Sequence, residues 1–398
     1  MMQISSFVDR FSEPQTLLMA KLGRELAAKG VNVINLSLGE PDFDTPQHIK
    51  DAAKKALDDG FTKYTPVAGF ADLRAAVCHK LKRDNNLEYT PEQTLVSTGA
   101  KQSLANVILA TINAGDEAVI PTPYWVTYSA LVEMAQGVCK FVSCGIEDHF
   151  KITPAKLEAA ITDKTRLFIF SSPCNPSGAV YSKEELAGLV EVFRKYPNIT
   201  IVSDEIYEYI NYVGKHESIA QFEEIREQVV LVNGFAKGFA MTGWRLGYIA
   251  APVAMIKACE KIQGSFTSGT NSIAQKAAVT ALLSDNTPSM EMVKAFHERR
   301  DFFITELNKI EGFKTLVPEG AFYAFPDISY YFGKKDAQGN EVNNADDFAL
   351  FLLNVAHVSG VSGAAFGNDQ CIRFSYAASM AQISEAVQRI KTALATLS

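Results

Sequence analysis

The chain has 398 residues, 47% of them apolar, and its 38 Lys and Arg against 45 Asp and Glu leave a net charge of −7. This is the composition of a globular protein with a sizeable core. A mildly acidic chain without basic tracts argues against a nucleic-acid or membrane-surface binder, and no apolar run reaches the length of a membrane span. Residues 1–11 lack the apolar run of a secretion signal, the six cysteines form no CxxC pair, and no HExxH occurs. We therefore expect a cytoplasmic protein without a metal site or disulfides.

The first half of the chain predicts a layered α/β arrangement. A helix is expected over 16–29, and a short strand over 31–36. From about residue 46 to 285, short apolar strands alternate with helical segments, which is typical of a mostly parallel, buried sheet flanked by helices. The expected strands of this sheet lie at 95–98, 117–120, 166–171, 200–203, 229–233 and 245–250.

The pattern changes after about residue 290. A long helix over 291–310 precedes short strands, which we expect at 314–317, 321–325 and 371–376. These elements indicate a smaller α+β domain. We predict a large domain over 46–288 and a small domain formed by 1–45 together with 289–398.

Unusual residues follow several predicted strands, where ligands bind in open α/β sheets. Gly99, Ala100 and Lys101 form a strand-to-helix turn whose free amides suit a phosphate, although glycine at such a junction is more often only part of a turn. Asp204 ends a buried strand. It is interpreted either as a helix N-cap or as the counter-ion of a protonated ring nitrogen.

Three basic residues stand out in the same way. Lys237 lies among small residues, where burial would lower the pKa of its amine as an imine with an aldehyde requires; the alternative is a surface lysine in a loop. Arg245, flanked by Gly243 and Gly247, suits a bidentate grip on phosphate. Arg373, inside an apolar segment, requires an anion, either an internal or a substrate carboxylate.

Other signals are weaker. Tyr124 and Trp125 are more often packing residues than ring-stacking partners, and Asn175 lies in a proline-bracketed turn where asparagine is common. The chain contains neither GxxxxGK[ST] nor GxGxxG, which counts against nucleotide and dinucleotide folds.

Taken together, these residues carry a family resemblance. The segment 234–247, GFAKGFAMTGWRLG, resembles the pyridoxal-phosphate attachment signature of class-I aminotransferases. Supporting blocks occur in the order expected for that family: SLGEPDF (37–43), KYTPVAG (63–69), SPCNPSG (172–178), SDEIY (203–207) and IRFSY (372–376). The resemblance extends from about residue 14 to the C-terminus and is greatest to bacterial aspartate aminotransferases. It implies the fold-type-I architecture of pyridoxal-phosphate-dependent transferases and a homodimer with sites at the subunit interface.

The resemblance assigns cofactor roles by matching position. Lys237 would form the Schiff base with the cofactor aldehyde and then move the proton between Cα and C4′. Asp204 would pair with the pyridinium nitrogen, which keeps the ring an electron sink. Asn175 and Tyr207 would hydrogen-bond the ring 3-oxygen, and Trp125 would stack on the ring.

The resemblance also implies a phosphate site and a substrate site. Arg245 would hold the phosphate together with the amides of Gly99, Ala100 and Lys101, and Tyr64 of the partner subunit would reach the same phosphate. Arg373 would bind the substrate α-carboxylate beside the Gly39 backbone, and Lys101 would bind a distal carboxylate with help from Thr16. The residues expected to contact substrate are Gly39, Thr16, Lys101, Trp125, Asn175 and Arg373.

The sequence departs from the family pattern at two positions. Gly234 stands where a phosphate-binding serine is frequent, which removes a hydroxyl and predicts weaker cofactor affinity. Ser362 stands where Pro-Gly is common. Neither position carries a proton-transfer residue.

The leading hypothesis is an aspartate:2-oxoglutarate aminotransferase that works by a ping-pong mechanism. One alternative changes the amino acceptor, as in glutamate/aspartate–prephenate aminotransferases, and Thr16 with Lys101 fits both. A second is a pyridoxal-phosphate-dependent C–S lyase, against which Lys101 argues because it suits a distal carboxylate. A third is a transcription regulator with this fold as its effector domain; it requires an added DNA-binding region, which we do not expect in an acidic chain of this kind.

Overall fold

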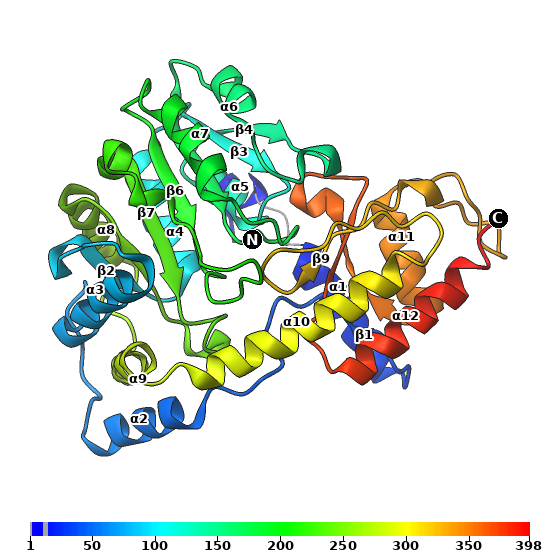
Figure 1. The fold of residues 1–398 in the computed structure, drawn as a ribbon, viewed down its shortest axis with the longest axis horizontal. Helices are drawn as coiled ribbons and strands as arrows, with labels where there is room; N and C mark the ends of the chain where they lie inside the picture. The colour runs from blue at the N-terminus through cyan, green and yellow to red at the C-terminus, as the bar shows by residue number, and fades with distance from the viewer. Residues whose placement is uncertain (1, 11–14) are drawn as a thin grey trace.

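The largest element is a seven-stranded sheet in the order β2-β8-β7-β6-β5-β3-β4, visible at the left of Figure 1. The structure is a computed structural model that describes residues 2–10 and 15–398. Strand β8 is antiparallel to β2 and β7, and the other neighbours are parallel, so the prediction of a mostly parallel sheet is confirmed. The strands are β2 (Thr94–Ser97), β3 (Glu117–Thr122), β4 (Val138–Ser143), β5 (Thr165–Ser171), β6 (Thr200–Asp204), β7 (Val229–Gly234) and β8 (Gly247–Ala250).

Helices cover both faces of this sheet because most of its strands are buried and apolar on both sides, edge strand β4 being the exception. On β5, Leu167 and Ile169 pack toward α4, α5 and α8, whereas Phe168 and Phe170 pack toward α3, α6, α7 and α9. Helix α2 packs on α9. The helices are α2 (Gln47–Asp58), α3 (Ala71–Asn85), α4 (Ala100–Thr111), α5 (Thr127–Met134), α6 (Pro154–Ala160), α7 (Lys183–Phe193), α8 (Val253–Phe266) and α9 (Ser272–Leu283).

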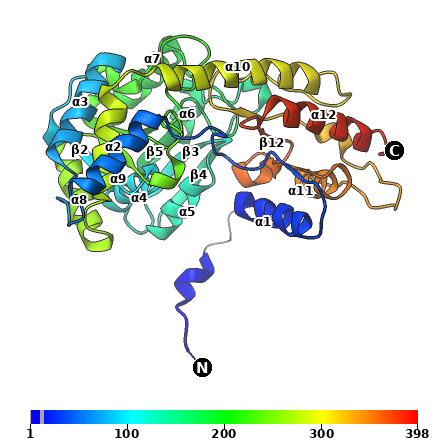
Figure 2. The same ribbon diagram turned by 90° about the horizontal axis from the view of Figure 1, so that it is seen from below.

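A second unit lies beside the sheet, and the long helix α10 runs from one to the other (Figures 1 and 2). Its sheets have the orders β11-β12-β9 and β1-β10. Its helices are α1 (Gln15–Ala28), α10 (Thr287–Leu307), α11 (Ala345–Phe351) and α12 (Met380–Leu394). Its strands are β1 (Ile34–Asn35), β9 (Tyr323–Ala324), β10 (Val358–Ser359), β11 (Val361–Ser362) and β12 (Ile372–Ser375).

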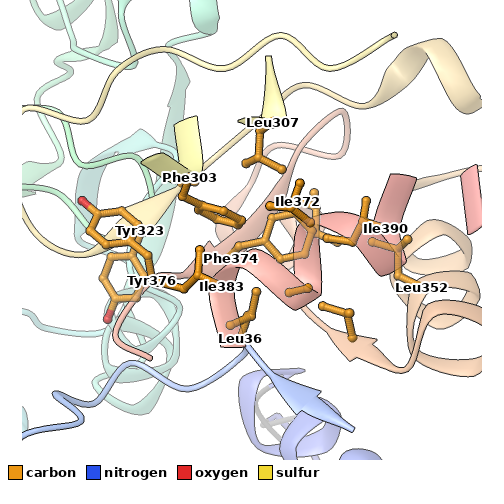
Figure 3. Close-up of a cluster of buried hydrophobic side chains, with 14 of the residues drawn as sticks. Leu36, Phe303, Leu307, Tyr323, Leu352, Ile372, Phe374, Tyr376, Ile383 and Ile390 are labelled. Atoms are coloured by element: carbon orange, nitrogen blue, oxygen red, sulfur yellow. The ribbon is translucent and has the colours of Figure 1, made fainter. Parts of the chain in front are cut away.

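The N-terminal segment belongs to the core of this second unit. Strand β1 pairs in parallel with β10, and Leu36 lies in one buried cluster with Phe303 and Phe374 (Figure 3). This packing agrees with the expectation that 1–45 joins the C-terminal part. The domain limits at 45/46 and 288/289 stay a prediction.

Several predicted elements differ from those observed. The strand expected at 31–36 has only two residues, and at 314–317 only Lys314 pairs, in an isolated bridge with Asp327. Strands β4, β10 and β11 were not predicted. Strand β4 is a largely exposed edge strand without a buried apolar run, and β10 and β11 have two residues each, too few for alternation to be recognised. The helix N-cap interpretation of Asp204 is wrong, since turns rather than a helix follow it.

No helix in the described part of the chain is both long enough and apolar enough to cross a membrane. The cysteines at positions 78, 139, 144, 174, 259 and 371 form no disulfide bonds.

Candidate active site

A cavity of about 400 Å³ lies where the carboxyl ends of β5, β6 and β7 meet the second unit. Polar residues after those strands line it together with residues of β9 and β12. The cavity brings together most of the residues that the sequence singled out, namely Gly39, Ala100, Lys101, Trp125, Asn175, Asp204, Tyr207, Lys237, Arg245 and Arg373.

Lys237 lies in the turn after β7 and is half-buried. Its Nζ donates a hydrogen bond to the Gly39 carbonyl. Burial lowers the pKa of this amine to about 8, against the opposing charge of Glu40. A neighbouring glycine permits this arrangement, because a Cβ at Gly238 would lie 2.6 Å from the ring of Tyr209. The alternative of a surface lysine in a loop is therefore wrong.

Asp204 ends β6 and is buried, with 3% of its surface exposed. Burial raises the pKa of this carboxyl to about 6, although the Tyr128 hydroxyl opposes the rise by donating to Oδ2 at 2.6 Å. The Ile206 N–H donates to Oδ1 at 3.3 Å. A buried carboxylate held by two donors is an environment that a protonated ring nitrogen would complete.

Arg373 on β12 is buried among neutral partners. Its Nη1 donates to Asn175 Oδ1 at 2.9 Å, and its Nη2 donates to the Ser37 carbonyl at 2.6 Å. The buried Nε has no hydrogen-bond partner, and no carboxylate among the described residues forms an ion pair with this guanidinium. The interpretation that Arg373 pairs with an internal carboxylate is therefore wrong for the described residues. A buried arginine without a carboxylate partner suits an anionic substrate.

The turn before α4 forms an anion site together with Arg245. Gly99 has a φ of +79°, and a Cβ there would lie 2.7 Å from Arg245 Nη2, so the guanidinium packs directly on the turn. Arg245 Nη1 donates to the Thr242 carbonyl at 3.0 Å. The helix N-terminus and the guanidinium both favour a negative group here, as phosphate binding requires.

Lys101 and Trp125 lie beside this turn. The Lys101 ammonium lies 5.2 Å from the centre of the Trp125 ring, and partial burial with the nearby charge of Arg245 lowers the pKa of Lys101. The packing interpretation holds for Tyr124, whose ring stacks on Phe141 at 5.1 Å. Trp125 both packs on Tyr128 and lines the cavity.

Of the other predicted residues, Gly99 and Tyr64 do not line the cavity. Tyr64 is 97% exposed and lies in the loop before α3, where it lines a separate surface hollow with Thr270. Its expected contact would come from a second chain. Thr16 falls within α1, and its side chain lies outside the residues whose placement is described.

Sequence reasoning missed several residues of the site, four of which make its main polar contacts or add charge. Tyr128 donates to Asp204, Ser37 accepts from Arg373, Glu40 lines the cavity, and Tyr323 bonds Tyr207. Antiparallel pairing of the two predicted strands at 321–325 and 371–376 would have placed Tyr323 near the arginine. Ser37 and Glu40 belong to the block SLGEPDF, which supported the family resemblance but did not single them out, and Tyr128 carries no motif or periodic signal.

A cluster of buried charges lies behind the turn that bears Asp204. In this rear ion cluster, Glu208 pairs with the fully buried Lys80, and Glu205 accepts from His216 Nε2 at 2.9 Å. Burial lowers the pKa of His216, but the negative charge of Glu205 outweighs this and leaves the pKa above its usual value. The two acids and the histidine are spaced like metal ligands, yet each acid already has a partner, Lys80 for Glu208 and His216 for Glu205.

These groups fit a phosphorylated ring aldehyde. An anion site at the start of α4, a buried carboxylate at the end of β6 and an amine of lowered pKa line one cavity, and Arg373 adds a carboxylate site. Such a constellation on an α/β sheet defines a cofactor-dependent enzyme that acts on amino or oxo acids.

Comparison with known proteins places the chain in a family. Residues 31–390 match the family model of class I and II aminotransferases, and the chain belongs to that family. A protein named aspartate/prephenate aminotransferase from Nitrosomonas europaea is 46% identical over 99% of this chain and 100% of its own length. A bifunctional aspartate aminotransferase and glutamate/aspartate-prephenate aminotransferase from Petunia hybrida is 45% identical over 99% of this chain and 83% of its own length.

Solved structures agree. The aspartate aminotransferase of Rhizobium meliloti superposes with a TM-score of 0.97 at 40% identity, with all of both chains covered. That of Thermus thermophilus with maleate gives 0.92 at 37% identity, over 99% of this chain and 100% of the other. The expected fold type, the aminotransferase activity and the cofactor pyridoxal phosphate are thereby confirmed.

The departure at Gly234 has a structural reason that the sequence did not reveal. Gly234 pairs with Gly247 of β8, and a Cβ at 234 would lie 2.9 Å from both Gly247 Cα and the Leu246 carbonyl. Glycine is needed here for the close approach of two strands. At the other departure, Ser362 Oγ caps the short helix Gly363–Phe366 by accepting from the Ala364 N–H at 3.3 Å.

We therefore expect Gly234→Ser to harm the protein rather than restore a phosphate ligand. Overpacking between β7 and β8 would lower the free energy of unfolding by about 1–3 kcal/mol. Urea unfolding of the apoprotein measures this. Gly243→Ser is the matched control, since a Cβ at Gly243 meets no atom within 4 Å. A Gly234→Ser protein as stable as the Gly243→Ser protein would contradict the packing argument.

The lowered pKa of Lys237 predicts a distinctive reactivity. A pKa of about 8 leaves about a tenth of this amine neutral at pH 7, compared with well under a thousandth for an ordinary lysine. Reductive labelling of the apoprotein with a small aldehyde should therefore modify Lys237 about a hundredfold faster than the exposed Lys183. Its rate should rise up to about pH 8 and then level off. Peptide mapping by mass spectrometry gives both rates in one digest, and a Lys237 rate that climbs steeply above pH 9 would contradict the assignment.

Proposed function

We propose that this protein transfers the amino group of L-aspartate to 2-oxoglutarate, giving oxaloacetate and L-glutamate, in two half-reactions. The observation that carries this proposal is the pair of cations Arg373 and Lys101, which line one cavity and form no ion pair with any described residue. Two such cations suit a substrate with two carboxylates. The names of the relatives from Petunia hybrida and Nitrosomonas europaea support the same substrate class.

The proposed roles follow from the contacts of each residue. Pyridoxal phosphate, when bound, supplies an aldehyde that takes the amino group and a ring that stabilises negative charge at the substrate Cα. Lys237, with its lowered pKa, is suited to hold this group and to move the proton at Cα. Asp204 holds the proton of the ring nitrogen, and Trp125 stacks on the ring. Tyr207 and Asn175 donate to the ring 3-oxygen.

The remaining site residues bind the two anionic ends. The amides of Ala100 and Lys101, with Gly99 and Arg245, hold the phosphate at the start of α4. Arg373 binds the substrate α-carboxylate beside Gly39. Lys101 serves twice, through its backbone N–H toward the phosphate and through its side chain toward the distal carboxylate.

The proposal includes a homodimer, two domains and a cytoplasmic location. Tyr64 is 97% exposed in this chain and belongs to a block that matches the family, which supports a role in a second subunit's site. The domains are proposed as 46–288 and 1–45 with 289–398, since the buried cluster around Phe374 joins Leu36 to the C-terminal part. Six unpaired cysteines support a reducing compartment.

A second candidate substrate is prephenate. The relative from Nitrosomonas europaea carries both aspartate and prephenate in its name. Prephenate also has two carboxylates, and Trp125 beside Lys101 offers an aromatic surface next to the cation. Half-reactions of the purified protein with aspartate, glutamate and prephenate, followed through the cofactor absorbance, test both candidates.

Lys101→Ser should separate substrate binding from cofactor binding. Loss of one ammonium facing a substrate carboxylate costs about 1.5–3 kcal/mol, so kcat/KM for aspartate should fall roughly ten- to over a hundredfold. The value for alanine should change little, and the cofactor dissociation constant should stay nearly the same. Lys101→Met is the matched control, because it keeps most of the aliphatic stem and loses only the charge. An equal loss for every amino acid together with easy cofactor release would make Lys101 a phosphate residue instead.

Mixing two inactive variants tests the shared site. In a mixed dimer of Tyr64→Ala and Lys237→Ala chains, one site has lost both groups and the other has kept both. Equal mixing after dissociation should then restore about a quarter of the wild-type activity, since half of the dimers are mixed. Coupled assays before and after mixing give the readout. Activity that stays at the level of the unmixed variants, or a protein that is an active monomer at assay concentration, would contradict the dimer.

A further inference from the structure

Tyr323 is a fully buried tyrosine of the second unit whose hydroxyl reaches the central sheet's side of the cavity. It lies on β9, which pairs with β12 through Tyr323 and Ser375, two residues beyond Arg373. Its hydroxyl lies 2.6 Å from the hydroxyl of Tyr207, which belongs to the turn after β6. This hydrogen bond therefore joins the two units at the site, and no role described above uses it.

The ring of Tyr323 also holds Arg373. The guanidinium carbon lies 4.6 Å from the centre of the Tyr323 ring and 4.9 Å from that of Phe366. Two aromatic rings within this distance attract the cation and restrict its orientation. The hydrogen-bond partners of Arg373 are neutral, so no carboxylate fixes the guanidinium group. The two rings therefore contribute to its orientation.

The Tyr323 hydroxyl has a third neighbour. A Cβ at Gly39 would lie 2.3 Å from it, so glycine is needed there for the close approach of the hydroxyl. The Gly39 carbonyl accepts the hydrogen bond of Lys237. Tyr323 thus contacts Tyr207, which is proposed to bind the cofactor, and also Arg373 and Gly39, which are proposed to bind the substrate.

We propose that Tyr323 is a positioning residue that couples the carboxylate-binding Arg373 to the cofactor-binding Tyr207. The proposal rests on the roles given to those two residues under the proposed function. When Tyr207 donates to the cofactor 3-oxygen, its own oxygen becomes the acceptor of the Tyr323 hydroxyl. Hydrogen bonds in such a chain polarise one another, so Tyr323 makes Tyr207 a stronger donor. Its ring meanwhile fixes the guanidinium that binds the substrate.

A purely packing role is the competing explanation, and Tyr376 provides the comparison. Tyr376 is equally buried on the neighbouring strand end and lies in the same cluster as Tyr323 (Figure 3). Its hydroxyl donates to the Ala321 carbonyl at 3.2 Å and to the Tyr212 hydroxyl at 3.4 Å, and neither partner lines the cavity. Tyr376→Phe therefore removes a buried hydroxyl from the same cluster without touching the site.

The decisive experiment titrates the absorbance of the holoenzyme with pH. In Tyr323→Phe, weaker donation from Tyr207 leaves the cofactor 3-oxygen more basic, so the midpoint should rise by about 0.5 pH unit. Tyr376→Phe should leave the midpoint unchanged. The other charged groups that face Tyr207 are Lys237, Arg373 and Asp204, and neither substitution removes any of them. A Tyr323→Phe midpoint equal to that of the wild type, or an equal shift in both variants, would overturn the coupling.

Binding of maleate, an unreactive dicarboxylate, tests the role of the ring. Tyr323→Phe keeps the ring and should bind maleate nearly as tightly as the wild type. Tyr323→Leu removes the ring and should weaken maleate binding by about tenfold. Phe366→Leu removes the other ring over Arg373 and should weaken binding to a similar degree, which keeps the test available if Tyr323→Leu does not fold. Unchanged maleate binding in Phe366→Leu would overturn the role of the rings. Borohydride reduction of the wild type distinguishes failure of this proposal from failure of the proposed function. If the reduced cofactor were found on a residue other than Lys237, the cofactor assignment itself would be refuted.

Discussion

The turn after β6 carries buried polar groups on both of its sides, and the site depends on how that turn is held. Asp204 and Tyr207 line the cavity, whereas Glu205 and Glu208 belong to the rear ion cluster. Removing one partner of a buried ion pair costs about 3–5 kcal/mol, because an uncompensated charge stays behind. A shift of the turn would separate Glu208 from Lys80 and Glu205 from His216, so the rear ion cluster restricts where the turn can lie. This anchoring lets the front of the turn present a carboxylate whose pKa burial has raised to about 6.

The N-terminal segment completes the site from the other side. The Ser37 carbonyl accepts from Arg373, the Gly39 carbonyl accepts from Lys237, and Glu40 accepts from Thr242. One short stretch of backbone therefore contacts both the second unit and the central sheet's side of the cavity. Its position depends on β1, which fixes the preceding residues beside β10. The cavity is consequently a junction of three segments far apart in the sequence.

The sequence predicted the layered sheet because most of its strands are apolar on both faces, whereas the largely exposed edge strand β4 was not predicted. The positions of Lys237, Asp204 and Arg245 at strand ends singled them out, but the family resemblance was needed to choose between their alternative interpretations. The sequence could not predict the contacts of Tyr323, since hydroxyl-to-hydroxyl contacts between distant segments leave no periodic signal. Gly234 was interpreted as a lost hydroxyl, whereas the structure shows a close approach to β8 that admits no side chain. The missing information in both cases is the distance between segments, which local patterns do not contain.

The charge of the site runs against the charge of the chain. The protein carries a net charge of −7, yet four cationic side chains line the cavity, against the two acids Glu40 and Asp204. A cavity lined by a surplus of one charge concentrates ligands of the opposite charge and rejects those of its own. The cofactor phosphate would neutralise Arg245, and a ring nitrogen would neutralise Asp204. Arg373 and Lys101 then remain to face the substrate, so a molecule with a single carboxylate would leave one cation in the cavity unpaired. Selectivity for dicarboxylates therefore follows as much from the cost of that unpaired cation as from the attraction of the second carboxylate.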